Sequence, residues 1–408
     1  MNEWKTAPIE SLLARSFPGE WGAEPDGGPT EAVVYRGADF ESSGRLGPDA
    51  GVRRNIPAGK LRKLSLKSGD ILLEKSGGSP EQPVGRVSLF EGLREAAVSS
   101  NFLQTLRPRG GIDSEFLLYL LQYEYRSGRV LPFQQQTTGI INFRLKDYLK
   151  EEVSLPADRR EQRQIAEVLS TLDEQIAQTE AMVEKLRASR GGLVNGVLAP
   201  AANRAESVSL GSVSSLVTSG SRGWARYYSD SGALFLRIGN LTREHPNLRF
   251  DDLVRVKVSE GGEGARTRLQ SGDLLVSITA DLGIIGCVPA GLGEAYINQH
   301  IALVRLAADD LDPRWAAHVL AATYGAKQFG RLNDSGAKAG LNLATIRGLR
   351  VARPALKEQL SIVALLDYVD AHIAAERGVL EKLRVKKHGL MRDLLTGNVR
   401  VSNNGQRQ

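Results

Sequence analysis

The sequence contains very little cysteine and no long apolar run. Cys287 is the only cysteine among 408 residues, so the chain can form neither an internal disulfide nor a zinc site built from several cysteines. No apolar stretch approaches the roughly 18 to 20 residues that a membrane-spanning helix requires. The first residues lack the basic and apolar regions of a signal peptide. We therefore expect a cytoplasmic protein without membrane contact.

The motifs of several enzyme classes are also missing. The single Gly-Lys pair, Gly59-Lys60, is followed by Leu61, so there is no Walker A loop. The sequence has no G-x-G-x-x-G, no H-E-x-x-H and no G-x-S-x-G motif. Scattered along the chain are five histidines: His245, His300, His318, His372 and His388. We expect no catalytic residue, no metal site and no bound cofactor in this chain.

The charge balance points weakly toward nucleic acid. The formal net charge is +6, while 41% hydrophobic and 25% charged residues are ordinary values for a soluble globular protein. A basic protein of this kind can bind a polyanion, but a solvated basic surface would give the same balance. The length allows two or three domains, each with a core of its own.

The chain contains one long segment twice. Glu161-Gln162 corresponds to Glu358-Gln359, and Glu184–Arg187 corresponds to Glu381–Arg384 at the same offset. Apolar residues recur in both copies at alternating steps of four and three, the spacing of a left-handed coiled coil, for about five heptads. The helix-pairing residues predicted from this spacing are Ile165, Leu169, Leu172, Ile176, Val183, Leu186, Ile362, Leu366, Val369, Ile373, Leu380 and Leu383.

Each long helix is expected to pair with the other in antiparallel orientation. Parallel helices would force the two globular segments that precede them to compete for space at one end. Polar residues interrupt both copies at matching places, Thr179 with Glu376 and Arg190 with Lys387. A polar residue in such a seam lowers stability but fixes register and partner. A dimerisation stalk is the simpler alternative for two long heptad helices.

The globular segments repeat more faintly. Leu66–Leu72 matches Leu269–Leu275, and both read as a Gly-Asp turn that leads into a buried strand. Asp113 and Asp312 occupy matching helix N-cap positions. Many Gly and Pro residues favour an α+β fold with short strands. The predicted organisation is a globular domain at 1–157, a long helix at 158–198, a second domain at 199–354, a second long helix at 355–396 and a flexible tail at 397–408.

This arrangement resembles the specificity subunits of type I restriction-modification enzymes over nearly the whole chain. The most specific part is P-x-x-x-x-E-Q-x-x-I-A-x-x-L-x-x-L-D-x-x-I, which runs from Pro156 to Ile176. The second copy, from Pro354 to Ile373, is one residue shorter after the proline and departs at Val363 and Val369. The duplication together with this motif is far more specific than either feature alone.

The resemblance implies a function in defence against foreign DNA. Each globular segment would be a target recognition domain that reads one half of a bipartite, asymmetric site in double-stranded DNA. The helices would set the gap between the half-sites and dock methyltransferase subunits, two of them, which would carry S-adenosylmethionine. Restriction and translocase subunits would complete the complex. The chain itself would catalyse no reaction.

The DNA contacts have no fixed motif in such a family, so residues are nominated by chemistry. Gln and Asn can form paired hydrogen bonds with adenine, while Lys and Arg mostly hold phosphates. The segments Ser99–Asn101 and Asn298–His300 correspond to each other, and either could reach bases or simply end a strand. The nominated residues are Gln134, Gln135, Gln136, Thr137, Thr138, Asn142, Asp334, Ser335, Lys338, Asn342, Arg222, Trp224, Arg226, Arg62, Lys63, Lys75, Arg266 and Arg268.

Other functions remain open at this point. The recognition subunit of a defence system with a different effector would have the same features. A coiled-coil scaffold that carries two protein-binding domains would share the helices, but it would show no salt-dependent DNA binding. A duplicated enzyme is disfavoured because no acid, base or nucleophile recurs in both halves at a recognisable spacing.

Overall fold

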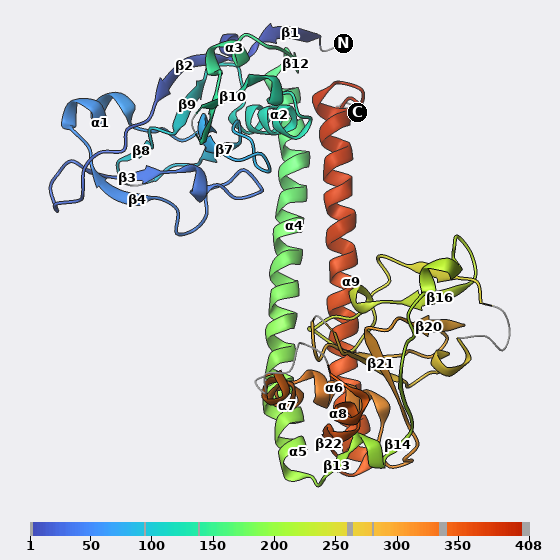
Figure 1. Cartoon of the computed structure of the whole chain (residues 1–408). Coiled ribbons are helices and arrows are strands. Elements are labelled where there is room, and N and C mark those ends of the chain that lie inside the picture. The colour runs from blue at the N-terminus through green and yellow to red at the C-terminus, as the bar shows by residue number, and fades with distance from the viewer. Residues whose placement is uncertain are drawn as a thin grey trace, which may run out of the picture. The chain divides into compact units, whose positions relative to one another are not determined.

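The computed structural model describes residues 3–93, 95–137, 139–258, 264–279, 281–333 and 341–401. The chain divides into two compact units (Figure 1). Unit 1 comprises Met1–Glu180 and Val379–Gln408, and unit 2 comprises Ala181–Gly378. None of the helices within the described ranges is long and apolar enough to cross a membrane.

Unit 1 contains a buried antiparallel sheet in the order β2-β9-β5-β7 and a smaller sheet in the order β4-β3-β8, in which β3 and β8 are parallel. Every residue of β5 is buried, and its three central residues, Ile71–Leu73, are apolar. The strands of unit 1 are β1 (Trp4–Pro8), β2 (Leu13–Pro18), β3 (Glu31–Tyr35), β4 (Val52–Asn55), β5 (Asp70–Glu74), β6 (Ser76–Gly78), β7 (Val87–Phe90), β8 (Ala97–Ser99), β9 (Leu103–Pro108), β10 (Gln134–Thr137), β11 (Ile140–Phe143) and β12 (Glu152–Pro156).

Three short helices accompany these strands: α1 (Ala58–Leu64), α2 (Ser114–Arg126) and α3 (Leu145–Tyr148). As predicted, Asp113 caps α2, and its carboxylate accepts hydrogen bonds from the backbone N–H groups of Glu115 and Phe116. The apolar face of α2 belongs to the same core as the main sheet.

Unit 2 repeats this plan. Its main sheet has the order β14-β21-β18-β19, and its second sheet has the order β15-β17-β16-β20 with β16 and β20 parallel. Its elements are α5 (Ala199–Arg204), β13 (Ser207–Ser209), β14 (Ser214–Ser219), β15 (Tyr228–Ser229), β16 (Ala233–Leu236), β17 (Val254–Val256), β18 (Leu274–Ser277), β19 (Ile285–Cys287), β20 (Ala295–Ile297), β21 (Ile301–Leu306), α6 (Pro313–Ala321), α7 (Thr323–Asn333), α8 (Leu343–Gly348) and β22 (Arg350–Ala352).

The two long helices are α4 (Arg159–Leu193) and α9 (Leu356–Leu395), and helical turns continue after α4 through Leu198. In unit 1, Asp173 of α4 pairs with Lys387 of α9, and Glu180 pairs with Arg384. Residue numbers rise along one helix as they fall along the other, so the predicted antiparallel pairing is confirmed. The compact units divide inside these helices rather than at the predicted domain boundaries, because each helix segment packs into the core of the unit that contains it.

The repeated Gly-Asp segment has a structural basis. Gly69 adopts a φ of +90°, which favours glycine, and Asp70 follows it with only 1% of its surface exposed. The Asp70 carboxylate accepts a hydrogen bond from the Lys67 backbone at 2.7 Å and two from the Arg107 guanidinium, both at 2.7 Å. The equivalent residues in unit 2 are Gly272, Asp273, Gln270 and Arg305.

The glutamine of the repeated Glu-Gln pair ties each long helix to its globular domain. Gln162 accepts a hydrogen bond from the Asp113 backbone at 2.9 Å and donates one to the Pro156 carbonyl at 2.9 Å. In unit 2, Gln359 accepts from the Asp312 backbone at 2.8 Å and donates to the Pro354 carbonyl at 2.7 Å. Both glutamines are fully buried. The most specific motif of the sequence is therefore a structural clamp.

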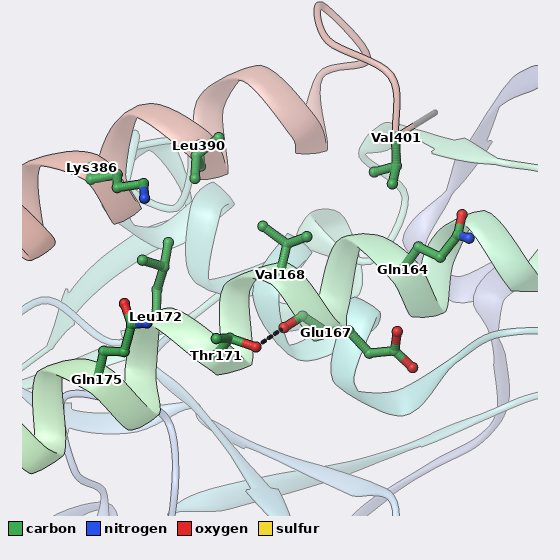
Figure 2. Close-up of a pocket in the computed structure, with 9 residues that line it drawn as sticks. All are labelled: Gln164, Glu167, Val168, Thr171, Leu172, Gln175, Lys386, Leu390 and Val401. Atoms are coloured by element: carbon green, nitrogen blue, oxygen red, sulfur yellow. Dashed lines mark hydrogen bonds between the residues drawn. The ribbon is translucent and has the colours of Figure 1, made fainter. Parts of the chain in front are cut away.

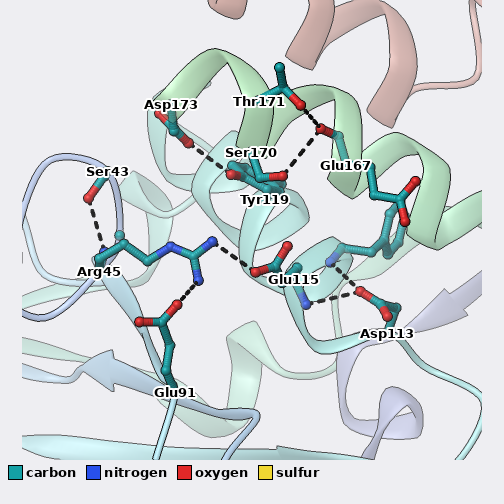
Figure 3. Close-up of polar contacts among 12 residues, drawn as sticks. Ser43, Arg45, Glu91, Asp113, Glu115, Tyr119, Glu167, Ser170, Thr171 and Asp173 are labelled. Carbon is teal, nitrogen blue, oxygen red and sulfur yellow. Dashed lines mark hydrogen bonds and ion pairs between the residues drawn. The ribbon is translucent and has the colours of Figure 1, made fainter. Parts of the chain in front are cut away.

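The two basic interruptions of the heptad pattern form equivalent buried ion pairs. Lys387 pairs with Asp173 in unit 1, and Arg190 pairs with Asp370 in unit 2. Tyr119 of α2 donates a hydrogen bond to Asp173 at 2.8 Å (Figure 3). Since Lys387 of α9 pairs with the same carboxylate, side chains from three helices meet there. The two basic seam positions are thus paired with carboxylates.

Candidate nucleic-acid interface

The two units share one backbone framework at the end of their central strands. In unit 1, the Lys75 N–H donates to the Phe102 carbonyl at 2.9 Å, and the Phe143 N–H donates to the Lys75 carbonyl at 2.9 Å. In unit 2, the Ile278 N–H donates to the His300 carbonyl at 2.9 Å, and the Leu341 N–H donates to the Ile278 carbonyl at 2.9 Å. Lys75 is therefore equivalent to Ile278, and Phe102 is equivalent to His300, so the correspondence of Ser99–Asn101 with Asn298–His300 predicted from the sequence is shifted by one residue.

We call the residues around the first of these frameworks the first edge (Lys75, Ser76, Phe102, Gln135 and Asn142). Those around the other form the second edge (Ile278, Thr279, Asn298, Gln299 and His300).

The first edge includes one face of a small sheet in the order β10-β11-β6. Gln135 lies opposite Asn142, which in turn lies opposite Ser76, and directly paired residues point to the same side of a sheet. The Ser76 hydroxyl donates to the Asn142 side-chain oxygen at 2.7 Å, whereas Gln135 is exposed. This face presents amide and hydroxyl groups, which suit hydrogen bonding to base edges.

Lys75 adds a positive charge beside this face. Burial lowers the pKa of its ammonium group. Its Nζ donates to the side-chain oxygen of Gln104 at 3.4 Å, and Gln104 donates to the Ser16 hydroxyl at 2.8 Å. Within the described part of the chain, Lys75 forms no ion pair. A half-buried cation without a carboxylate partner is suited to bind phosphate or the acceptor atoms of guanine.

Phe102 supplies an apolar contact at the same edge. Its side chain is 47% exposed, although phenylalanine is usually buried. The ring lies along Gly77, where a Cβ atom would come within 3.6 Å of the Phe102 Cδ2 atom. The sequence reasoning missed this residue, because one exposed aromatic in a turn leaves no periodic signal.

The second edge has a different chemistry on the same framework. The His300 ring is hydrogen-bonded to the Thr279 hydroxyl through Nδ1 and to the Gln299 amide nitrogen at 2.9 Å through Nε2. The His300 N–H also donates to the Asn298 side-chain oxygen at 3.1 Å. A proton on Nδ1 of a neutral ring satisfies both ring contacts, with Gln299 donating to Nε2. The edge is thus a continuous polar row.

Three nominated residues have structural roles within their own domains. Gln134 accepts from the Val84 N–H at 3.0 Å and donates to the Val84 and Val130 carbonyls, so its amide anchors β10. Trp224 is only 3% exposed and packs in a small aromatic core. Asn342 caps α8 by accepting from the Thr345 N–H at 2.8 Å. For Gln134 and Trp224 the nomination is corrected, because burial and internal bonds occupy the groups that would bind DNA.

The nominated cations within the described ranges are exposed, apart from the half-buried Lys75. Arg62 and Lys63 lie on α1, and they form no ion pair among the residues that the structure covers. The Arg266 guanidinium donates to the Ser219 carbonyl at 3.4 Å, while the Arg226 guanidinium lies 4.9 Å from the Tyr227 ring centroid. The two remaining exposed cations are Arg222 and Arg268. Gln136 is also exposed.

Four nominated residues lie outside the described ranges: Thr138, Asp334, Ser335 and Lys338. For Thr137 only the backbone is described, and it pairs with Ile140. These residues stay predictions.

One cluster in unit 2 has the composition of a metal site. Ligand atoms of His318, Asp367 and Asp370 lie within 4.8 Å of one another. Arg314 and Arg190 already pair with the two carboxylates, so the charges balance. Although burial opposes it, hydrogen bonds from His318 and Arg314 lower the pKa of Asp367 to about 2. We assign this cluster to the packing of α6 against α9.

A groove of about 450 Å³ lies along the helices of unit 1 (Figure 2). Val168 projects from α4 between Gln164 and Leu172, while Leu390 and Lys386 belong to α9. The groove is mostly apolar and open, unlike the two polar edges. Its chemistry fits a protein partner better than DNA.

Comparison with known proteins identifies the family. A relative in Methanocaldococcus jannaschii, the putative type I restriction enzyme MjaX specificity subunit, is 24% identical over 377 residues, which cover 86% of this chain and 83% of the relative. The MjaVIII specificity subunit of the same organism is 20% identical over 361 residues, which cover 84% and 82%.

A similar fold occurs in the crystal structure of a type I restriction-modification S subunit from M. genitalium. The TM-score is 0.66 at 16% identity, over 97% of this chain and 96% of that one. The model of the type I restriction modification DNA specificity domain matches residues 52–187 and 235–385, well over half of the chain. The chain therefore belongs to the type I restriction-modification DNA specificity family.

Proposed function

We propose that this chain is the DNA-recognition subunit of a type I restriction-modification complex, in which each globular domain reads one half of a bipartite site. The observation that carries the proposal is the repeated framework with different side chains. Lys75 and Phe102 at the first edge correspond to Ile278 and His300 at the second. The equivalent positions of the two edges support a DNA-binding role for both domains. The different side chains at the two edges support two different half-sites, and therefore an asymmetric DNA site.

The helices carry two further functions in this proposal, which are setting the gap between half-sites and docking methyltransferase subunits. Several large apolar side chains on them are exposed, which is typical of an interaction surface when they gather on one element. They are Val168, Met182, Leu356, Leu360, Leu365, Tyr368, Val379 and Val385. The groove lined by Val168 and Leu390 supports docking in unit 1.

In this proposal the partner subunits catalyse the reactions. Two methyltransferase subunits would bind S-adenosylmethionine and methylate adenine, and restriction and translocase subunits would act on unmodified DNA. The chain itself would bind no cofactor and catalyse no reaction. Such a complex acts on DNA in the cytoplasm.

The test is a long-read map of adenine methylation in the host, with the gene intact and deleted. We expect deletion to erase one bipartite motif with a non-specific gap, and re-expression of the gene to restore it. An unchanged map, while a cognate methyltransferase is expressed, would overturn the proposal and favour a protein scaffold. A purified scaffold with its partners would also show no salt-dependent DNA binding.

A further inference from the structure

We propose that Phe102 and Gln299 determine specificity, each for one half-site, and that His300 positions Gln299. This inference rests on the proposed function and deepens it by assigning base contacts to residues. Asn101-Phe102 and Gln299-His300 occupy equivalent positions immediately before β9 and β21. The carbonyls of Phe102 and His300 both accept from the residue that follows the central strand, at 2.9 Å.

Phe102 fits contact with an apolar part of a base. The apolar feature of a base pair in the major groove is the C5-methyl group of thymine. The Phe102 ring is 47% exposed, and its Cδ2 atom lies 3.6 Å from where a Cβ atom on Gly77 would be. The neighbouring Lys75 supplies the charge that keeps a DNA strand close. The first edge therefore favours thymine at the position that Phe102 reaches.

Gln299 fits a different base. A glutamine amide can donate to N7 and accept from N6 of adenine in the paired fashion that distinguishes this base. The His300 ring holds the Gln299 nitrogen at 2.9 Å, and the ring is fixed in turn by Thr279. Among the described residues, the Gln299 side-chain oxygen has no protein partner. An amide oriented by a fixed ring loses less rotational freedom on binding than a mobile one.

The equivalence of Phe102 and His300 makes the inference more than a nomination by residue type. The same backbone hydrogen bonds place the Phe102 ring in one unit and, in the other, the His300 ring that orients the neighbouring Gln299 amide. A framework that keeps its geometry while its side chains change has the properties that a reader of variable sequence requires. The two substitutions must then affect different halves of one motif.

The experiment compares methylation maps of hosts that express Phe102→Ala, Gln299→Ala or the unchanged chain with its methyltransferase. We expect Phe102→Ala to relax one or more positions in one half-site, with a loss of discrimination of roughly tenfold or more, while the other half and the gap persist. Gln299→Ala should relax the other half only. Leu131→Ala and Gln270→Ala remove exposed side chains of similar kinds in the same units and should leave the motif unchanged.

The positioning role of His300 has its own readout. His300→Ala should relax the same half-site position as Gln299→Ala, with a smaller loss. His300→Asn, which keeps a hydrogen-bonding side chain, should restore part of the discrimination. A purely structural role would instead lower total methylation without changing the motif.

Several outcomes would overturn the inference. They are an unchanged motif in both alanine variants, relaxation of the same half by both, or equal losses of binding by the purified complex on target and scrambled DNA. If an alanine variant lowers the amount of complex, Phe102→Leu and Gln299→Asn test the same positions with smaller changes. A motif that depends on the gene but not on these residues refutes only this inference, whereas a motif that survives gene deletion refutes the proposed function.

Discussion

Lys387 and Asp173 form a buried ion pair whose counterpart is the pair between Arg190 and Asp370. In each case the carboxylate lies on one long helix and the cation lies on the other. Lys387 also lies 5.4 Å from the ring centroid of Tyr119, and burial lowers the pKa of the Lys387 ammonium group. The pairs thus combine a helix-pairing role with a contact to the globular domain.

Replacing Lys387 with methionine should lower the free energy of unfolding by about 3 kcal/mol, because the Asp173 carboxylate would stay buried without its cation. Chemical denaturation of the full chain, monitored by circular dichroism, measures the change. The double variant Lys387→Met with Asp173→Asn should recover part of the loss. Equal stability of the single variant and the unchanged chain would contradict a contribution from this pair.

Removal of the glutamine clamp should lower the free energy of unfolding by a similar amount. Gln162→Leu would leave the Asp113 N–H and the Pro156 carbonyl unpaired in a buried region, at a cost of about 2 to 4 kcal/mol. Gln162→Glu keeps the acceptor but removes the donor and buries a carboxylate beside the Pro156 carbonyl, so its cost should be at least as large. The measurement is thermal unfolding of both variants. The control is Gln175→Leu, which replaces an exposed glutamine on the same helix. A neutral Gln162→Leu variant would rule out the clamp.

Acid should weaken unit 2 through His318. Burial lowers the pKa of His318 despite hydrogen bonding to Asp367, with Arg314 and Asp370 as the other charged neighbours. The His318 ring therefore stays neutral in the folded state at pH values where it takes up a proton in the unfolded state. The free energy of unfolding then falls as the pH drops below about 6.5, by at most about 1.4 kcal/mol per pH unit. Asp367 acts in a separate window, and its contribution is lost only as the pH falls from about 4 toward 2.

The measurement for this prediction is urea denaturation of the full chain between pH 7 and pH 5. His318→Gln should reduce the pH dependence in that range. His388→Gln, which replaces an exposed histidine of α9, should not. If the two variants showed the same pH dependence, His318 would not be the source.

The exposed cations of α1 provide a prediction for DNA binding. Arg62→Ala or Lys63→Ala in the purified complex should weaken binding to target and unrelated DNA alike and reduce the slope of log K against log salt by about one. Lys146→Ala, at an exposed lysine of the same unit that is not nominated, serves as the control. A loss confined to target DNA would move the residue to the base-reading class.

The sequence predicts the long helices well, because heptad spacing is a local signal that repeats many times. Leu169 and Leu366, nominated from that spacing, are fully buried. The polar interruptions at Arg190 and Lys387 are visible in the sequence, but their partners Asp173 and Asp370 depend on how the helices are paired. The role of Gln162 also escapes a sequence argument, because it binds backbone atoms that carry no residue-specific signal.

The candidate DNA contacts are harder to predict from sequence. Trp224 sits between two arginines in a turn, which favours an exposed aromatic, but the structure buries its ring against Phe235 and Tyr296. Phe102 lies in an ordinary strand-to-strand turn, and only the shared backbone hydrogen bonds relate it to His300. The exposure of an aromatic side chain and the equivalence of Phe102 with His300 both depend on contacts between residues that are distant in the chain.

The clamps formed by Gln162 and Gln359 have a consequence for how such a protein can change. Each glutamine holds only main-chain groups of its domain, the N–H of Asp113 or Asp312 and the carbonyl of Pro156 or Pro354. Main-chain groups survive almost any substitution. Under the proposed function, mutation of the edges can change the DNA target without loosening the junction between each domain and its long helix, so stability and target choice can evolve separately.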